Sequence, residues 1–187
     1  SESGYRALSL DELYRVMVGE LKIDGRFVVY TFDDGYIDNY TVAYPIFKRL
    51  GIPFGIYVTT GFPDKTADIW WYALSDLVEK SSEIAFSYGG RDYVYETNSR
   101  KAKDDAISKI LRMVVGAGKQ KEALIETIFS KSGVDRKAYV AEMALEWKHI
   151  EEMSSEGLVT IGTHTLTHPN LKQLEVSEAE REILESR

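Results

Sequence analysis

Two short segments of this sequence carry residue types that could perform chemistry together. Asp33 and Asp34 are adjacent, and two of the three histidines, His164 and His168, lie four positions apart. Adjacent carboxylates repel each other unless a positive charge lies between them, and a metal ion supplies that charge. Two imidazoles and one carboxylate, with one position open for water, make a common catalytic zinc site. These residues therefore predict a metal centre in which the second carboxylate is left free as a base.

Each segment also has a simpler interpretation. The two aspartates could begin a helix, where carboxylates interact favourably with the helix dipole. The two histidines could be exposed polar residues, because their spacing alone is a weak signal. Pro169 disfavours helical geometry at His168, so we expect a loop there. The choice between these alternatives depends on whether the neighbouring strands and helices bring the two segments together.

Both segments follow strands that we expect to be buried. The apolar run 26–32 precedes the aspartates, the run 158–162 precedes the histidines, and 54–58 is a third such run. Nearly unbroken apolar runs are typical of strands buried on both faces of a parallel sheet. A helix over 38–50, kinked or delayed by Pro45, completes a strand–helix–strand unit. Because functional loops gather at the carboxyl ends of parallel strands, we expect the two segments to meet.

The rest of the chain is expected to be mainly helical. Ser9 and Glu12 have the spacing of a capping box at the start of a helix over 7–20. The region 69–146 interrupts the strand–helix rhythm, and we expect it to be a helical and hairpin insertion within one domain that covers 1–187. The remaining expected elements are a helix over 69–80, a hairpin over 83–96 around Gly89-Gly90, helices over 100–144 with breaks near 116–118 and 132–133, a helix over 147–155, and a last helix that Ser177 caps.

Composition excludes several classes of function. The 187 residues are 44% apolar and 28% charged, which is ordinary for a folded protein. The formal net charge of −7 disfavours binding to nucleic acid. Cysteine is absent, so disulfides and thiol chemistry are excluded and any metal must use His, Asp or Glu. No apolar run approaches the roughly 20 residues that cross a membrane, so we expect no transmembrane segment and a soluble protein, either cytoplasmic or exported.

The two segments together resemble a known family. The segment 31–35 (TFDDG), followed by the segment 164–169 (HTLTHP), resembles the first two motifs of the polysaccharide deacetylases, the nodulation-deacetylase homology domain of carbohydrate esterase family four. The resemblance covers roughly residues 26–187. It implies an α/β fold of the distorted (β/α) barrel type, of which this chain would form a part together with the helical insertion.

The resemblance also implies a role for each residue. Asp33 would be the catalytic base, and Asp34, His164 and His168 would bind a divalent metal ion, most commonly zinc, with cobalt, nickel or manganese as alternatives. Thr165 would hold its loop by hydrogen bonds. The implied reaction is hydrolysis of the carbon–nitrogen amide bond of N-acetylated sugars in a polysaccharide or glycan precursor, which releases acetate and a free amine.

The chain departs from the family pattern at its carboxyl end. It ends at Arg187, before three later motifs that supply an arginine, an oxyanion-binding loop and a late histidine. It also begins at Ser1 and not at Met, so we expect an incomplete domain with a trimmed start. We interpret His149, which precedes the candidate metal loop, as a packing or surface histidine. We expect the open sheet edge to be covered by the insertion or by another copy of the chain.

Two other functions stay open from the sequence. One is a related amidase that acts on a small non-sugar amide, and the other is a catalytically impaired carbohydrate-binding fragment. A binding protein has no need of Asp33 beside an ion, which favours an enzyme. The aromatic cluster 70–72 could be a sugar platform, although helix packing is the commoner use of such clusters. The five glutamates of the acidic tail are interpreted as a solvated helix face; they are Glu175, Glu178, Glu180, Glu182 and Glu185.

Overall fold

The structure, a computed structural model, describes residues 4–187, so residues 1–3 of the expected domain lie outside the described part. The chain divides into two compact units. Unit 1 consists of the residues up to Ala67 together with Val140–Pro169 and Ser177–Arg187, and unit 2 consists of Asp68–Tyr139 and Asn170–Val176. The interpretation of 69–146 as an insertion within one domain stays a prediction.

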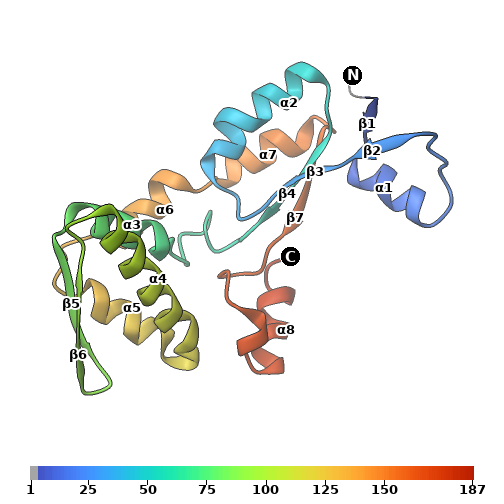
Figure 1. The fold of residues 1–187 in the computed structure, drawn as a ribbon. Coiled ribbons are helices and arrows are strands. Elements are labelled where there is room, and N and C mark those ends of the chain that lie inside the picture. The colour runs from blue at the N-terminus through green and yellow to red at the C-terminus, as the bar shows by residue number, and fades with distance from the viewer. Residues whose placement is uncertain (1–3) are drawn as a thin grey trace. The chain divides into compact units, whose positions relative to one another are not determined.

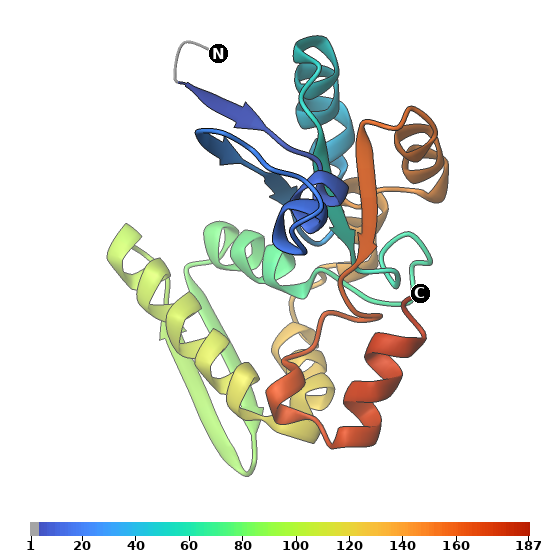
Figure 2. The ribbon, with the colours of Figure 1, turned by 90° about the vertical axis from the view of Figure 1, so that its right-hand side faces the viewer.

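Unit 1 is built around a three-stranded parallel sheet with the order β3-β4-β7 (Figure 1, Figure 2). The central strand β4 (Phe54–Val58) pairs with β3 (Tyr30–Phe32) on one side and with β7 (Val159–Thr163) on the other. Phe54, Ile56 and Val58 of β4 are buried and Tyr57 is partly buried, as the unbroken run 54–58 predicted. All three strands run in the same direction, so their carboxyl ends lie at one edge of the sheet.

The apolar run 26–32 is not the single buried strand that we predicted. It divides into β2 (Arg26–Val28) and β3, with a break at Val29. In the described part of the chain, β2 pairs only with β1 (Tyr5–Ala7), and β3 pairs only with β4. Phe27 and Tyr30 are each 38% exposed, so the run is not buried on both faces. β1 was not predicted, and its last residue, Ala7, falls within the predicted helix over 7–20.

Local capping signals explain where the helices of unit 1 begin and end. Ser9 caps α1 (Leu10–Met17), and both hydrogen bonds of the predicted capping box with Glu12 are present. Pro45 lies in the first turn of α2 (Tyr44–Leu50). Helical structure already begins at Ile37 and passes through a π-helical turn over Asn39–Ala43, so the helix predicted over 38–50 is present and Pro45 follows a change of helix type, not a late start. The structure ends this helix at Gly51, whose φ of 62° is the left-handed conformation that glycine adopts readily.

The core of unit 1 forms where helices pack on the sheet. α2 lies beside α7 (Trp147–Ser155) in Figure 1, and Lys48 of α2 forms an ion pair with Glu156, directly after α7. Tyr40, in the π-helical turn before α2, donates a hydrogen bond to Glu152 of α7. Fully burying an aliphatic or aromatic side chain stabilises a fold by about 1.5–3 kcal/mol. The buried residues of this core are Tyr44, Phe54, Ile56, Val58, Leu145, Ile150, Met153 and Val159.

Unit 2 combines helices with one hairpin. β5 (Glu83–Tyr88) and β6 (Arg91–Glu96) pair in antiparallel fashion around Gly89 and Gly90, and both glycines have positive φ, so the predicted hairpin is confirmed. The helices are α3 (Trp70–Lys80), α4 (Arg100–Gly116), α5 (Lys121–Phe129) and α6 (Arg136–Met143). A 3-10 turn over Gly118–Gln120 separates α4 from α5. The residues of α6 after Tyr139 belong to unit 1. The helix breaks therefore fall where they were predicted.

The last helix differs from its prediction in one detail. α8 (Val176–Leu184) begins before Ser177, so Ser177 lies inside the helix and is not its cap. A short 3-10 turn over Leu171–Gln173 precedes it. Within residues 4–187, no helix combines the length and the apolar character that a membrane span requires.

Candidate metal centre

A tight turn presents Asp34 at the end of β3. The amide of Gly35 donates to the carbonyl of Asp33 at 2.8 Å, and Asp34 itself has a φ of 69°. A non-glycine residue with positive φ is uncommon. Gly35 follows with a φ of 84°, and a Cβ there would lie 3.0 Å from a methyl group of Val58. The turn therefore needs glycine at position 35, as the sequence supplies.

A second unusual turn follows β7 and carries both histidines. Thr165 and His168 have φ values of 67° and 56°. The hydroxyl oxygen of Thr165 accepts a hydrogen bond from the amide of His168 at 3.1 Å. The predicted loop geometry at His168 is thus present, and Thr165 makes a hydrogen bond within its loop.

Thr59, directly after β4, connects the two turns. Its amide donates to the carbonyl of Asp34 at 3.1 Å, and its hydroxyl donates to the carbonyl of His164 at 3.0 Å. Thr59 is completely buried. Sequence reasoning missed this residue, since its only signal was its place after the central strand between two functional loops.

The structure brings Asp34, His164 and His168 together. Oδ1 of Asp34 lies 3.5 Å from Nε2 of His164 and 3.2 Å from Nε2 of His168. One ligand atom from each residue lies within 4.8 Å of the others. Ligands at about 2.0–2.1 Å around a tetrahedral zinc ion lie about 3.3 Å apart. The two distances from Asp34 therefore fit a shared metal ion, and they also fit direct contact between the carboxylate and the imidazoles.

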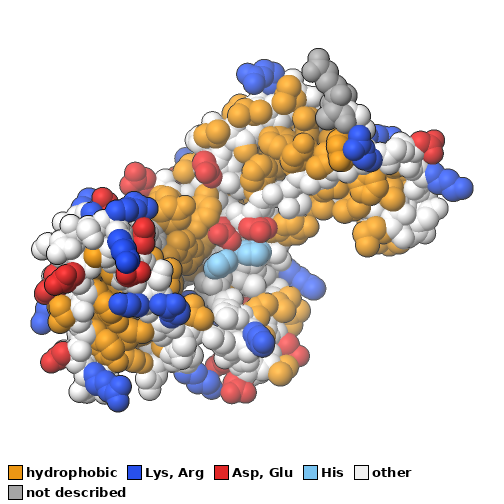
Figure 3. All heavy atoms as spheres, in the orientation of Figure 1, with side chains coloured by type: hydrophobic (Ala, Val, Ile, Leu, Met, Phe, Trp, Pro, Cys, Tyr) orange, Lys and Arg blue, Asp and Glu red, His pale blue; other side chains and the backbone are white. Residues whose placement is uncertain are grey.

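The electrostatics of this cluster favour an ionised carboxylate. A hydrogen bond from His168 lowers the pKa of Asp34 below its ordinary value, with further help from the charges of both imidazoles and against a smaller opposing effect of burial. The side chain of Asp34 is 19% exposed, against 37% for His164 and 36% for His168. Figure 3 shows histidine and acidic side chains gathered at the surface. The cluster is therefore open to solvent on the histidine side.

Asp33 occupies a different environment from Asp34. It is exposed, and it lies directly beside Asp34 in the chain. Its neighbour has its carboxylate among the histidines, so the structure separates the two adjacent carboxylates into one that is partly buried and one that faces water.

One member of the acidic tail is buried, which contradicts the predicted solvated face. Glu182 on α8 is 4% exposed. Its carboxylate accepts hydrogen bonds from the amides of Leu166 and Thr167 at 3.0 and 2.8 Å, and from the Thr167 hydroxyl at 2.8 Å. These bonds satisfy the carboxylate and so allow its burial, which a count of charges along the sequence cannot anticipate.

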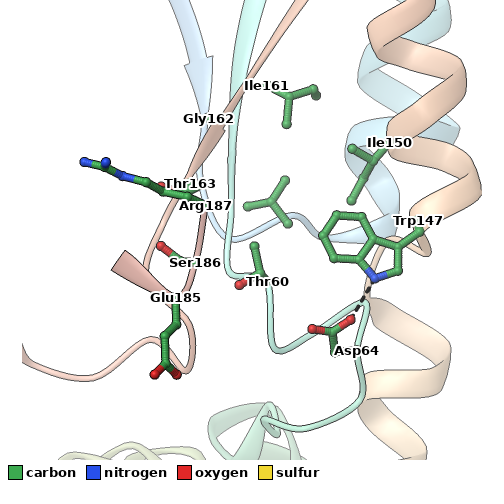
Figure 4. Close-up of a pocket in the computed structure, with 11 residues that line it drawn as sticks. Thr60, Asp64, Trp147, Ile150, Ile161, Gly162, Thr163, Glu185, Ser186 and Arg187 are labelled. Carbon is green, nitrogen blue, oxygen red and sulfur yellow. Dashed lines mark hydrogen bonds between the residues drawn. The ribbon is translucent and has the colours of Figure 1, made fainter. Parts of the chain in front are cut away.

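Unit 1 also contains a cavity of about 280 Å³ (Figure 4), whose lining does not include Asp34, His164 or His168. Its lining includes Thr60 and Thr163, which are the neighbours in sequence of Thr59 and His164. The indole of Trp147 lines another side and donates a hydrogen bond to Asp64 at 2.8 Å. The cavity therefore combines an aromatic wall with polar groups beside the two loops.

The structure also places His149 and the aromatic cluster 70–72. His149 stacks on Tyr40 with ring centroids 4.5 Å apart, and its Nδ1 accepts the amide of Glu146, so its interpretation as a packing histidine is confirmed. In the cluster 70–72, Trp70 is buried in the core of unit 2 and Trp71 packs against that core. Helix packing therefore accounts for both tryptophans.

Comparison with known proteins identifies the family. The family model described as polysaccharide deacetylase matches residues 21–187. The chain belongs to the polysaccharide deacetylase family. Among curated proteins, YxkH of Bacillus subtilis (strain 168), provisionally named a polysaccharide deacetylase, is 37% identical over 57 residues, which are 30% of this chain and 20% of the relative.

A solved deacetylase structure shares the mixed α/β fold. The deacetylase PplD of Streptococcus pyogenes, solved in complex with acetate, is 20% identical with a TM-score of 0.51, and the match covers 99% of this chain and 49% of that one. IcaB of Ammonifex degensii is 17% identical with a TM-score of 0.47, over 99% of this chain and 51% of that one. The chain spans about half the length of these two structures. Its match to the curated relative covers 20% of that protein. The sheets formed within residues 4–187 do not close into a barrel.

Proposed function

We propose that this chain is part of a divalent-metal-dependent hydrolase that removes N-acetyl groups from N-acetylated sugars of a polysaccharide or glycan precursor. The observation that carries the proposal is the cluster of Asp34, His164 and His168, whose spacing fits one ion, in a chain of the polysaccharide deacetylase family. The sheet of unit 1 would be a segment of a distorted (β/α) barrel.

Asp34, His164 and His168 would hold the ion. Imidazole and carboxylate donors suit zinc first, and cobalt, nickel and manganese as well. When bound, such an ion would acidify a water molecule and polarise the acetamide carbonyl. Asp34 would present a carboxylate oxygen to the ion, since its Oδ1 faces the Nε2 atoms of both histidines.

Asp33 would act as the base. Its exposure leaves the carboxylate accessible to the attacking water, from which it would take a proton. The water oxygen adds to the acetamide carbon, the carbon–nitrogen bond breaks, and the proton passes to the departing amine. The products are acetate and a free amino sugar. Thr165 would support the reaction by holding the loop of residues 164–168, here called the histidine loop, through its bond to the His168 amide.

The substitution Asp33→Asn tests the assignment of the base. In the protein that contains this chain, the variant should keep its metal content and lose about 10²- to 10⁴-fold in turnover of N-acetylglucosamine oligomers. Unchanged turnover would overturn the proposed role of Asp33. A protein that retains zinc but hydrolyses only small cyclic amides would be the alternative amidase. One that binds the oligomers without turnover, with or without Asp33, would be a carbohydrate-binding protein.

A further inference from the structure

Glu182 is a buried charged residue, and the side-chain hydrogen bonds that it makes within residues 4–187 all reach one loop. Oε2 accepts the amides of Leu166 and Thr167, and Oε1 accepts the Thr167 hydroxyl. The backbone carbonyl of Glu182 also accepts the Leu166 amide, at 3.1 Å. A buried carboxylate is costly without such partners. Here the partners come from the two residues in the middle of the histidine loop.

The loop that Glu182 holds is strained at both ends. Thr165 and His168 flank the two held residues, and both have positive φ. Non-glycine residues keep this backbone conformation only where surrounding contacts determine it. On its other side the loop is held by β4 and the residues after it, because the carbonyls of Thr165 and Leu166 accept the amides of Thr60 and Gly61. Glu182 supplies the contacts on the side of α8.

We propose that Glu182 is a positioning residue that sets the distance between His168 and the other two members of the cluster. This inference rests on the proposed function, since it assigns Glu182 to support of a metal ligand. The carboxylate acts through hydrogen-bond geometry: two amides share one oxygen and a hydroxyl occupies the other. It holds the backbone of Leu166 and Thr167, and thereby the direction in which His168 leaves the loop.

Three substitutions separate geometry from charge. Glu182→Gln has nearly the same shape, so its carbonyl oxygen can accept both amides while its amide group donates to the Thr167 hydroxyl. Glu182→Asp keeps the charge but withdraws the carboxylate by one methylene. Glu182→Ala removes every side-chain bond. We expect zinc affinity to follow the order Glu, Gln, Asp, Ala, whereas an effect of charge alone would place Asp above Gln.

The measurement is zinc affinity of the 187-residue chain by competition with a chelating dye. We expect Glu182→Gln to stay within about threefold of the unsubstituted chain and Glu182→Ala to lose about 10- to 100-fold, the usual effect of removing a group that supports a metal ligand. The visible spectrum of the cobalt-loaded chain should change in the Ala and Asp variants. A role limited to stability would leave that spectrum and the affinity of folded protein unchanged.

Glu180→Ala is the matched control, because Glu180 is an exposed glutamate on the same helix. It should leave affinity and spectrum as in the unsubstituted chain. If Glu182→Ala does not fold, the order of the Gln and Asp variants still decides the question. Equal zinc affinity in all folded variants would overturn the role of Glu182 while leaving the proposed function in place. Absence of zinc binding in the unsubstituted chain would overturn both.

Discussion

Oδ1 of Asp34 lies 3.2 Å from Nε2 of His168, although the two residues come from distant segments of the chain. The contact joins the end of β3 to the loop after β7, two strands that do not pair with each other. The buried Thr59 between them, at the end of the central strand, binds the backbone of both segments. The cluster thus depends on strand order as much as on the residues in it.

The contact between Asp34 and His168 predicts a dependence of stability on pH in the metal-free chain. The pKa of Asp34 is lowered on folding, so its contribution to stability is present above the ordinary value of 3.8 and is lost as the pH falls through the folded value. Asp34→Asn should therefore lower the melting temperature near pH 6, measured with a chelator present. The difference between the two proteins should shrink below pH 3.8. A difference that grows in acid would contradict this account.

Thr59→Val should weaken both the fold and the candidate centre. The substitution keeps the shape but leaves the carbonyl of His164 without the hydroxyl, at a cost of about 1–3 kcal/mol in the free energy of unfolding. Zinc affinity should fall by about tenfold, as expected for a group that supports a ligand. Thr41→Val is the control, because Thr41 is exposed and its hydroxyl donates to the carbonyl of Ile37, four residues earlier in the chain. Equal unfolding free energies in the two variants would refute the role of Thr59.

Gly61→Ala should disturb the histidine loop from the side of β4. A Cβ at position 61 would lie 2.4 Å from the carbonyl oxygen of Leu166, which is backbone and cannot move aside cheaply. We expect a loss of about 1–3 kcal/mol in stability, the usual cost of overpacking, together with weaker zinc binding. Gly116→Ala is the matched control, since a Cβ there meets nothing within 4 Å. If neither substitution changes stability or zinc binding, the close approach of Gly61 to Leu166 is not needed to hold the histidine loop.

Much of the fold could be predicted where short-range signals act alone. The capping box of Ser9, the end of α2 at Gly51 and the hairpin at Gly89 all depend on residues close in sequence, and each is present. The strand 54–58 was predictable because a central strand is apolar on both faces. The approach of the two loops was expected from strand direction, and the structure places their side chains together. That they bind a metal stays a prediction.

The errors arose where distant segments decide the outcome. The run 26–32 divides because β1, which has no strong strand pattern of its own, pairs with its first half. Glu182 looked like a surface residue because its partners lie in another loop. Apolar character gave no signal either, because Glu182 is buried whereas the apolar Ile183 and Leu184 beside it are exposed. The residue types along one segment do not show which distant segment it will contact, so neither the pairing of β1 nor the bonds of Glu182 could be predicted.

The most direct test of the account is X-ray absorption spectroscopy of the zinc-loaded chain, with His168→Ala as the comparison. We expect one zinc ion with two imidazole nitrogens at about 2.0–2.1 Å and carboxylate oxygen at about 2.0–2.2 Å, and one imidazole fewer in the variant. A spectrum with no imidazole scattering, or one that His168→Ala leaves unchanged, would contradict the assignment of Asp34, His164 and His168 as the ligands.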